Sequence, residues 1–531
     1  MIPDNKILIL DGAMGTMIQR YGLPEAEFKG NNEYLNIIHP EIIYQIHKEY
    51  IAAGADIIET NTFSANEIPQ IEYGCEAKAY EMALAGARIA RKAADDAMKS
   101  FEAQRLERRI FVAGSIGPTS KSLSLSPDAS DASFRPYSFT AMKKAYKSQA
   151  SALIEGGADL LLLETCFDAL NAKAALCAIE ELNIETGRLA TDEKIPVIIS
   201  VSVGDRSGRT LTGQTLKAFY ASVRHYPLTA FGLNCSLGAE ELMPLMQDIA
   251  QWCRCRTICY PNAGLPNEMG GYDQKPYQMA KAVRKIADKG LIDIAGGCCG
   301  TTPEHIKAIA EALEGVQTRC NTISEPEDNS FAPGTLTVSG LEAVTIDTGK
   351  YNFTNIGERT NVAGSRKFAR LISEHNYDEA LRIAAGQIEG GASVIDINMD
   401  DAMLESDTEM MKFVRCVSND PNVAKAALMI DSSHWETILA GLSNAQGKCI
   451  VNSLSLKEGE EAFISKAVTV KAFGASVVVM AFDEQGQATD FERKTSICER
   501  AYRILTDKVG FAPEDIIFDA NILAIGTGTV L

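Results

Sequence analysis

The chain has 531 residues, of which 46% are hydrophobic and 23% are charged, and its formal net charge is −19. This composition is ordinary for a globular protein, and the length allows roughly three domains, or two if they are barrels. The acidic balance argues against nucleic acid or an anionic membrane as the main partner. No apolar run approaches membrane-spanning length, and no signal peptide is evident. We therefore expect a cytoplasmic enzyme of small molecules, or a protein that docks to a basic partner, whose 13 cysteines are reduced thiols.

Short apolar runs alternate with amphipathic stretches along the first half, and they predict strands alternating with helices. Several of these helices end in glycine just before the next strand, as at Gly54 and Gly157, which is typical of an αβ turn. The count and spacing of the units favour a (β/α)8 barrel, and a doubly wound sheet is the structural alternative. The expected strands are 7–10, 56–59, 110–113, 160–164, 197–201, 230–234, 257–260 and 292–295.

Residues 318–350 interrupt this rhythm with a polar stretch that contains proline and glycine, and they predict a linker between domains at 1–317 and 351–531. The alternation then resumes, with expected strands at 353–356, 394–397, 428–430, 449–451, 477–481 and 516–518. A barrel with six strands would still need about two more strand–helix units. The predicted fold class is therefore α/β, with two (β/α)8 TIM-type barrels in tandem and the second incomplete at its C-terminal end.

Three cysteines follow two of the predicted strands of the first half. Cys235 ends the stretch Gly232-Leu233-Asn234-Cys235, and Cys298 and Cys299 lie between glycines in Gly296-Gly297-Cys298-Cys299-Gly300. A barrel brings its strand ends together at the face where barrel enzymes place their sites. Three thiolates suit Zn²⁺ and leave its fourth tetrahedral position open. Because the spacing is not that of a zinc finger, buried structural thiols or a strained disulfide are the alternatives.

Other strand ends of the first half carry acidic residues. Asp11 and Gly12 follow the first strand, Glu59 ends the second, and Glu164 ends the fourth. Carboxylates at the mouth of a barrel can hold an ammonium group, and they can equally form strand-end ion pairs. One further group of thiols is a rival metal cluster, which we interpret as structural: Cys253, Cys255 and Cys259.

Acid or amide side chains accompany nearly every predicted strand of the second half. Each one alone is usually a helix cap or a turn residue. Their recurrence favours a ring of polar groups around a flat heterocycle rich in N–H donors, such as a pterin. The lack of a basic cluster that could bind phosphate argues against a nucleotide as the ligand. The candidate residues are Asn355, Glu358, Arg359, Asn361, Asp396, Asn398, Asp431, Asn452, Asp483, Asp519 and Asn521.

The first half resembles the homocysteine-binding domain of homocysteine methyltransferases. The matching stretches begin at Asp11, Glu59, Gly114, Glu164, Gly232 and Gly296. The resemblance implies a barrel in which Cys235, Cys298 and Cys299 hold zinc. It also implies that Asp11, Gly12 and Glu164 hold the amino-acid end of homocysteine. A free thiol has a pKa of about 8.5, so little of it is thiolate at neutral pH. Coordination by zinc would deprotonate the substrate thiol.

The second half resembles the pterin-binding domain of cobalamin-dependent methionine synthases and related methyltransferases. The matching stretches begin at Thr354, Asp396, Met429, Val451 and Phe518. The resemblance implies that 5-methyltetrahydrofolate is the methyl donor, and Asn521 is the candidate catalytic residue because its amide could bond N5 of the pterin. The Asp-x-His-x-x-Gly stretch that supplies the lower cobalt ligand in that family does not occur here, so we expect cobalamin to come from another module or protein.

These features together predict methyl transfer from 5-methyltetrahydrofolate, through an external cobalamin, to zinc-activated homocysteine, giving methionine and tetrahydrofolate. One alternative is a cobalamin-independent homocysteine S-methyltransferase that uses a betaine or sulfonium donor and keeps the second half as a structural barrel. A third interpretation is a binding module without enzymatic activity. The expected partners are homocysteine, methyltetrahydrofolate and a cobalamin-binding domain or protein, with neither nucleic acid nor membrane.

Overall fold

The computed structural model describes residues 6–188, 190, 192–267, 271–322, 327–350 and 353–522. By their contacts they divide into two compact units. The first unit lies within Met1–Ser122, Pro136–Leu216 and Pro227–Asp328, and the second lies within Asn329–Leu531 and two earlier segments, Leu123–Arg135 and Lys217–Tyr226. None of the helices in the described ranges combines the length and apolar character that a membrane span requires.

The first unit is built on a closed parallel barrel. Its described strands follow the order β1-β8-β7-β6-β5-β4-β3-β2, and a parallel bridge between Leu10 and Ile57 joins the first strand to the second. This closure confirms the predicted barrel and rules out the open doubly wound sheet. The strands are β1 (Leu8–Ile9), β2 (Ile57–Glu59), β3 (Phe111–Ile116), β4 (Leu160–Cys166), β5 (Val197–Val201), β6 (Leu228–Gly238), β7 (Arg256–Asn262) and β8 (Ile294–Ala295).

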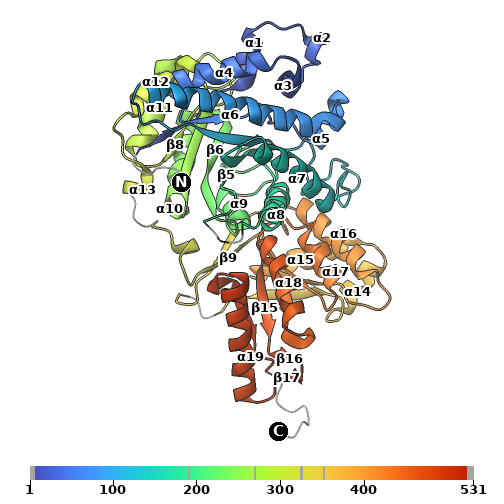
Figure 1. Cartoon of the computed structure of the whole chain (residues 1–531). Coiled ribbons are helices and arrows are strands. Elements are labelled where there is room, and N and C mark those ends of the chain that lie inside the picture. Colours follow the sequence, from blue (N-terminus) through green and yellow to red (C-terminus); the bar gives the residue numbers. More distant parts are fainter. Residues whose placement is uncertain are drawn as a thin grey trace. The chain divides into compact units, whose positions relative to one another are not determined.

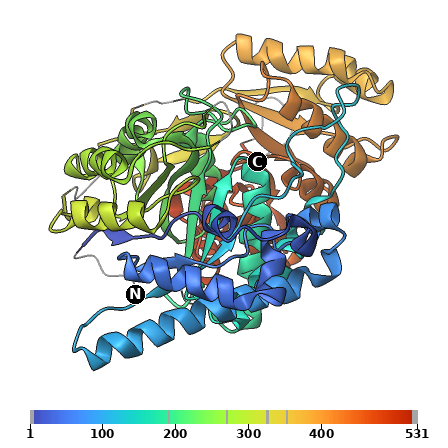
Figure 2. The same ribbon diagram turned by 90° about the horizontal axis from the view of Figure 1, so that it is seen from above.

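Helices lie around the outside of this barrel (Figures 1 and 2). The longer ones are α4 (Pro40–Ala52), α6 (Ala79–Ala103), α7 (Phe139–Glu155), α8 (Ala169–Glu185), α10 (Ala239–Trp252), α11 (Pro276–Asp288) and α12 (Pro303–Leu313). Helix α9 (Leu216–Val223) lies almost wholly within Lys217–Tyr226 and so belongs to the second unit. Short helices are α1 (Met14–Arg20), α2 (Glu25–Phe28), α3 (Leu35–Ile38), α5 (Glu67–Gln70) and α13 (Arg319–Thr322). Gly54 and Gly157 have φ values of 114° and 96°, so the expected glycine turns are present before β2 and β4.

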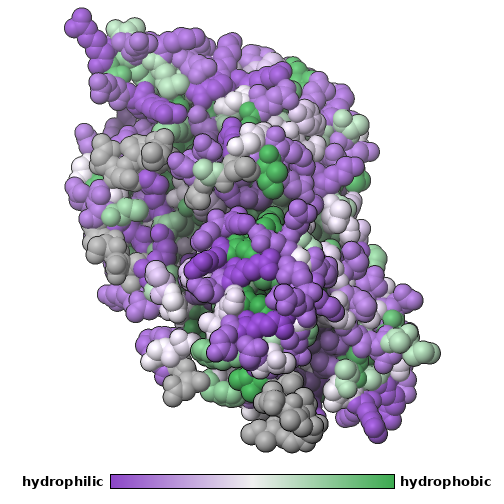
Figure 3. All heavy atoms as spheres, turned by 60° about the horizontal axis from the view of Figure 1, so that its bottom comes forward, coloured by the Kyte–Doolittle hydropathy of each residue, from purple (hydrophilic) through white to green (hydrophobic). Residues whose placement is uncertain are grey.

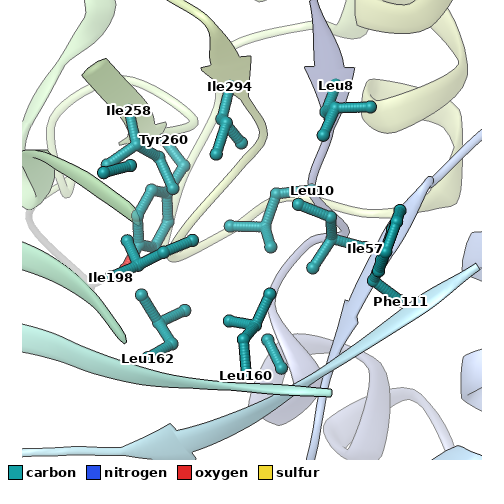
Figure 4. Packing of buried hydrophobic residues seen from close by; sticks show 12 residues of the cluster. Leu8, Leu10, Ile57, Phe111, Leu160, Leu162, Ile198, Ile258, Tyr260 and Ile294 are labelled. Atoms are coloured by element: carbon teal, nitrogen blue, oxygen red, sulfur yellow. The ribbon is translucent and has the colours of Figure 1, made fainter. Parts of the chain in front are cut away.

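Apolar side chains fill the interior of the barrel, where residues such as Leu10, Leu162 and Ile258 point toward one another (Figure 4). Side chains alternate along a strand, so the residue two positions further on faces the same interior. At the carboxyl ends of the strands these next inward-facing positions are polar. They are Glu59, Ser115, Glu164, Ser200 and Asn234. The barrel therefore carries a polar layer on top of an apolar core.

The second unit contains a parallel sheet with the sequential strand order β11-β12-β13-β14-β15-β18, as in a barrel of this type. The strands are β11 (Ile356–Asn361), β12 (Val394–Asn398), β13 (Ala427–Asp431), β14 (Ile450–Leu454), β15 (Ser476–Met480) and β18 (Ile516–Asp519), with a small hairpin of β16 (Phe482–Asp483) and β17 (Gly486–Gln487). Its helices are α14 (Arg366–Ser373), α15 (Tyr377–Glu389), α16 (Ser406–Asn419), α17 (Trp435–Leu442), α18 (Glu460–Ala472) and α19 (Phe491–Arg503). The tandem α/β architecture expected from the sequence is thus confirmed.

Part of the predicted linker is folded as a hairpin of the second unit. Strands β9 (Leu336–Ser339) and β10 (Ala343–Ile346) pair antiparallel. Leu336 and Val338 pack against apolar residues at the starts of the parallel strands, including Val394 and Ala427. The hairpin therefore covers the amino-terminal end of this sheet's interior, and the opposite end is left to polar residues.

Two segments from earlier in the chain also belong to the second unit, which the sequence boundaries did not anticipate. Arg415 on α16 donates from Nη1 to the carbonyl of Ser133 at 3.1 Å, and Asn419 donates to Ala132 at 3.2 Å. Buried Arg135 donates to the carbonyls of Leu123 at 2.8 Å and Ser124 at 2.7 Å. On the molecular face in Figure 3, hydrophilic residues dominate and hydrophobic ones form a narrow strip.

Candidate functional site

Three thiols converge at the carboxyl-terminal end of the first barrel. Cys235 lies in β6, and Cys298 and Cys299 lie in the loop between β8 and α12. Their sulfur atoms all lie within 4.8 Å of one another, and the Sγ atoms of Cys235 and Cys299 are 3.8 Å apart. Among the described residues this is the one group of His, Cys, Asp and Glu side chains close enough to hold a metal ion. The structure thus brings together the cysteines that the sequence singled out. We call Cys235, Cys298 and Cys299 the thiol cluster.

The backbone around the thiol cluster is held firmly. The N–H of Cys298 donates to the carbonyl of Pro261 at 2.8 Å, and that of Cys299 donates to Asn262 Oδ1 at 3.1 Å. Cys235 and Ser236 both have a φ of 58°, a left-handed conformation that side-chain-bearing residues rarely adopt. Such strain persists where surrounding contacts fix it, and it is concentrated at functional sites.

The three thiols share their protons unequally. Hydrogen bonds from Cys298 and Cys299 lower the pKa of Cys235 to about 3. The corresponding bonds with Cys235 raise the pKa of Cys298 well above its usual range and raise that of Cys299 to about 11. The cluster therefore favours one thiolate that accepts from two thiols. Sulfurs this close to one another have the donor set and the proximity that a thiophilic metal ion requires.

Asn234 supports the thiol cluster from the polar layer of the barrel. Its Nδ2 donates to Thr165 Oγ1 at 2.8 Å and lies 3.8 Å from the sulfur of Cys298. Its Oδ1 accepts from Thr165 N at 3.0 Å and from Ser200 Oγ at 2.7 Å. Sequence analysis did not select Asn234 as a site residue, although it directly precedes Cys235. The amide links the end of β4 to a sulfur atom of the cluster.

Three carboxyl groups form an acidic cluster in the same barrel: Asp11, Glu59 and Glu164. Asp11 and Glu164 are buried, Asp11 accepts from the backbone N–H of Glu59 at 3.1 Å, and the hydroxyl of Ser115 donates to Glu164. Asp11 Oδ1 and Glu59 Oε1 are buried and have no hydrogen-bond partner among the described residues. Burial of a carboxylate without a partner is costly, so these oxygen atoms are suited to a cationic or N–H-donating ligand.

Burial and mutual repulsion shift the titration of the acidic cluster. Desolvation raises the pKa of Asp11 and of Glu59 well above the usual range, and the charge of Glu164 raises both further. Desolvation also raises the pKa of Glu164 to about 7, against the hydrogen bond from Ser115. Glu59, which the sequence presented only as one strand-end carboxylate, is therefore an integral member. Its inward-facing position two residues after Ile57 is the signal that could have identified it.

A groove with a volume of about 700 Å³ opens beside the thiol cluster and is lined in part by Thr16, Tyr272, Cys299 and Gly300. Burial and the neighbouring thiol of Cys299 raise the pKa of Tyr272. Its side chain also packs directly on Gly300, where a Cβ atom would lie 2.3 Å from Tyr272 Cβ. The groove gives a ligand access to the partly exposed thiols from outside the barrel.

A row of polar side chains crosses the second sheet at the carboxyl ends of its strands. Asn361 pairs in register with Asn398, Asn398 with Asp431, and Asp431 with Asn452, so their side chains share one face. Asn398 Nδ2 donates to Asp431 Oδ2 at 3.0 Å. We call these four residues the polar row.

Asp396 lies one layer deeper than the polar row and faces the same interior, because Val394, two residues before it, belongs to the apolar core. Its side chain is buried, and its Oδ1 has no hydrogen-bond partner among the described residues. Desolvation and the neighbouring charge of Asp431 raise its pKa to about 7, although hydrogen bonds with Asn361 and Asn452 oppose the shift. Asp396 thus presents an unused acceptor to the interior of the sheet.

Three other candidates lie at the same end of the sheet. Glu358 acts electrostatically on Asp396 and Asp431 and raises the pKa of both. Asp519 ends β18, and its Oδ1 accepts from Asn521 N at 2.8 Å. Asn521 has a φ of 50°, and its Nδ2 is buried without a hydrogen-bond partner among the described residues.

The remaining candidates are Asn355, Asp483 and Arg359. The sequence predicted a strand at 353–356 followed by a polar loop, whereas β11 begins at Ile356, so Asn355 lies at the far end of the strand from the polar row. Asp483 forms an ion pair with Arg493 at 2.5 Å in the β16–β17 hairpin. Arg359 is exposed, and its backbone N–H donates to Gln387 at 2.6 Å. Asn355 is thus at the opposite end of β11 from the polar row, whereas pterin contacts by Asp483 and Arg359 stay a prediction.

The fold and the site together define the class of this protein: a closed α/β barrel in which three thiols lie beside buried carboxyl groups. Residues 8–313 match the family of homocysteine S-methyltransferase, and residues 357–530 match that of pterin binding enzyme. Because the first match spans more than half of the chain, the chain belongs to the homocysteine S-methyltransferase family. The same pair of domains is found in the N-terminal modules of methionine synthase.

Solved structures similar to this chain include the homocysteine methyltransferase MmuM from Escherichia coli. Its oxidized form is 24% identical, with 57% of this chain and 95% of that chain covered and a TM-score of 0.46. Its metallated form is also 24% identical, with 58% of this chain and 96% of that chain covered and a TM-score of 0.44.

Proposed function

We propose that the chain transfers a methyl group to the sulfur of homocysteine, with 5-methyltetrahydrofolate in the second unit as the source of that group. Membership of the homocysteine S-methyltransferase family supports the acceptor, and the match of the second half to pterin binding enzymes supports the donor class. The observation that carries the proposal is the convergence of three sulfur atoms within 4.8 Å in the same barrel as the acidic cluster.

The residues of the thiol cluster fit a zinc ion. Cys235, Cys298 and Cys299 would hold it, because three thiolates leave one tetrahedral position for a substrate sulfur. Zinc, when bound, would lower the pKa of the homocysteine thiol so that it reacts as a thiolate near neutral pH. Asn234 would keep Cys298 in place through its contact with that sulfur.

The acidic cluster would bind the amino-acid end of homocysteine. The unpartnered oxygen atoms of Asp11 and Glu59 would accept from the ammonium group, and Glu164 would add a third carboxyl group. Because its pKa is raised to about 7, the carboxyl group of Glu164 is partly protonated near neutral pH. A protonated carboxyl group can donate to the substrate carboxylate, so the cluster can bind both ends of the zwitterion. Gly12 would contribute backbone groups, because it has no side chain to block their approach.

The polar row and Asp396 would bind the pterin ring of the folate. Asp396 Oδ1 and the carboxylate of Asp431 are acceptors suited to the N–H groups of a pterin. Asn521 would lie against N5, because its amide can donate or accept as the protonation of that nitrogen changes. Cobalamin, supplied by another module or protein, would carry the methyl group from the folate to the acceptor.

The first experiment measures zinc content and methyl transfer to homocysteine with free methylcobalamin, and separately with a sulfonium compound or a betaine as donor. We expect about one zinc per chain, turnover with methylcobalamin, and loss of both in Cys298→Ala. A matched control is Cys253→Ala, which removes a buried thiol outside the thiol cluster. Zinc-dependent turnover retained in Cys298→Ala contradicts the metal assignment, and turnover only with the sulfonium or betaine donor contradicts the cobalamin route.

A further inference from the structure

Thr301 joins two loops that carry different parts of the first site. Its buried Oγ1 accepts from the N–H of Ala13 at 3.1 Å and donates to the carbonyl of Cys298 at 2.6 Å. Ala13 follows Asp11 and Gly12 in the loop after β1, and Cys298 belongs to the loop after β8. One hydroxyl group therefore connects the backbone beside the acidic cluster to the backbone of a thiol-cluster residue.

Tyr50, on α4, approaches the same junction from the helix layer. Its fully buried hydroxyl lies 3.1 Å from the carbonyl oxygen of Ala13 and 3.4 Å from that of Thr301. It carries one proton and can donate to either carbonyl group. The hydroxyl of Tyr50 is thus a second polar group between the two loops. It acts through the carbonyl groups of Ala13 and Thr301 rather than on Asp11 or Cys298.

Gly12 is enclosed by these two side chains. A Cβ atom built on it would lie 2.7 Å from Thr301 Oγ1 and 2.9 Å from Tyr50 Cε1. Gly297 packs on Thr301 in the same way, since its Cβ would lie 2.5 Å from Thr301 Cγ2. The backbone at both glycines therefore packs closely on Thr301, where a side chain would not fit, so the hydrogen bonds lie in a tightly packed junction.

We propose that Thr301 and Tyr50 are positioning residues that set the separation between the acidic cluster and the thiol cluster, so that both ends of one amino-acid thiol are held at once. The inference rests on the proposed function, because it assumes a substrate that spans the two clusters. Both side chains are buried and act through the backbone of Ala13 and Cys298. Holding two ends together makes the second contact intramolecular, and that advantage depends on the distance between the sites.

A purely structural role predicts a different result. If the junction only supported the fold or the thiol cluster, its loss would weaken the binding of zinc and of every thiol alike. A positioning role weakens only a ligand that uses both clusters. Mercaptoethanol offers a thiol without an amino-acid end, so it reports on the thiol cluster alone, whereas homocysteine reports on both.

The test uses the full chain loaded with zinc and titrates it with homocysteine and with mercaptoethanol by calorimetry. Thr301→Val keeps the shape of the side chain but removes its hydroxyl, and Thr301→Ser keeps the hydroxyl. We expect Thr301→Val to weaken homocysteine binding by about tenfold while mercaptoethanol binding changes by less than about twofold and zinc content is unchanged. Thr301→Ser should bind homocysteine like the unsubstituted protein, and Tyr50→Phe should follow Thr301→Val in direction.

Two results would overturn the inference: equal weakening of both thiols in Thr301→Val, or unchanged homocysteine binding in both Thr301→Val and Tyr50→Phe. Should either variant fail to fold, as its melting curve would reveal, the other one decides. The unsubstituted protein is measured first. If it binds zinc but no homocysteine, the proposed function itself fails, and that outcome is distinct from a failure confined to the variants.

Discussion

Asn234 and Thr165 are joined by two reciprocal hydrogen bonds: Asn234 donates to Thr165 Oγ1 at 2.8 Å and accepts from Thr165 N at 3.0 Å. Thr165 has a φ of 56°, so this pair also holds a strained backbone in place directly after Glu164. The same amide lies 3.8 Å from the sulfur of Cys298. The pair therefore couples the end of β4, which carries a carboxyl group of the acidic cluster, to the thiol cluster.

Asn234→Ala should weaken zinc binding by about tenfold to a hundredfold, because groups that orient metal ligands have effects of this size. Competition with a chelator of known affinity measures the change. Asn183→Ala is the matched control, since Asn183 is a fully buried asparagine that accepts from Ile195 N at 3.0 Å, outside the site. The control should lower the melting temperature but leave zinc affinity intact. Equal zinc affinity in both variants would show that Asn234 does not act on the thiol cluster.

The barrel of the first unit was predictable from the sequence because its signals are local. Apolar runs of strand length and the glycines at positions such as Gly54 mark each strand–helix unit, and the cysteines stand out by type. The start of β11 was misplaced because its later residues line a polar interior and do not form an apolar run. The roles of Tyr50 and Thr301 had no sequence signal, since they arise from contacts between loops far apart in the chain.

Glu59→Gln should make the protein more stable and weaken its binding of homocysteine. Desolvation and the charges of Glu164 and Asp11 raise the pKa of Glu59 well above its usual range, so its ionised form destabilises the folded state. The destabilisation grows as the pH rises above the ordinary pKa of 4.5, and glutamine should remove it. Melting curves at several pH values and a homocysteine titration test this. Glu76→Gln, at an exposed site, is the control. Normal binding of homocysteine by Glu59→Gln would exclude Glu59 from the ammonium site.

Asp396→Asn should change how the stability of the second unit depends on pH. The pKa of Asp396 is about 7 in the folded chain and 3.8 as its ordinary value, so the folded state binds the proton more tightly. Stability is therefore expected to fall as the pH rises from about 4 to about 7, by at most about 4 kcal/mol, and to stay low above that range. Asp396→Asn should lack this fall and bind methyltetrahydrofolate poorly.

Denaturant unfolding between pH 4 and pH 8 checks the Asp396 prediction, with values at about one-unit steps. Exposed Asp407 supplies the control, because Asp407→Asn should keep the pH dependence of the unsubstituted protein. The same fall in both variants would mean that another group causes it. Normal folate binding by Asp396→Asn would remove Asp396 from the proposed pterin contacts.

Residues 329–531 expressed alone should melt well below the second unit of the full chain. The fragment lacks Leu123–Arg135 and Lys217–Tyr226, which belong to that unit. Without them, Arg415 on α16 loses its acceptor at Ser133, and the ring of Tyr220 no longer packs against Phe331 at a centroid distance of 5.0 Å. Calorimetry of the fragment and of the full chain measures the difference.

A substitution in the full chain separates this effect from mere truncation. Arg415→Ala should destabilise the second unit by about 2 kcal/mol, because it leaves the carbonyl of Ser133 and the amide of Asn444 without their donor. Arg382→Ala, which removes an exposed ion pair with Glu379 at 2.6 Å, should cost less than about 0.5 kcal/mol. If the fragment melts like the full chain, or if the two substitutions cost the same, the early segments do not stabilise the second unit. If the fragment melts early and Arg415→Ala is costly, part of the second unit's stability comes from residues some two hundred positions before its sheet. A single boundary drawn between the two halves of the sequence therefore cannot separate the complete second unit from the first.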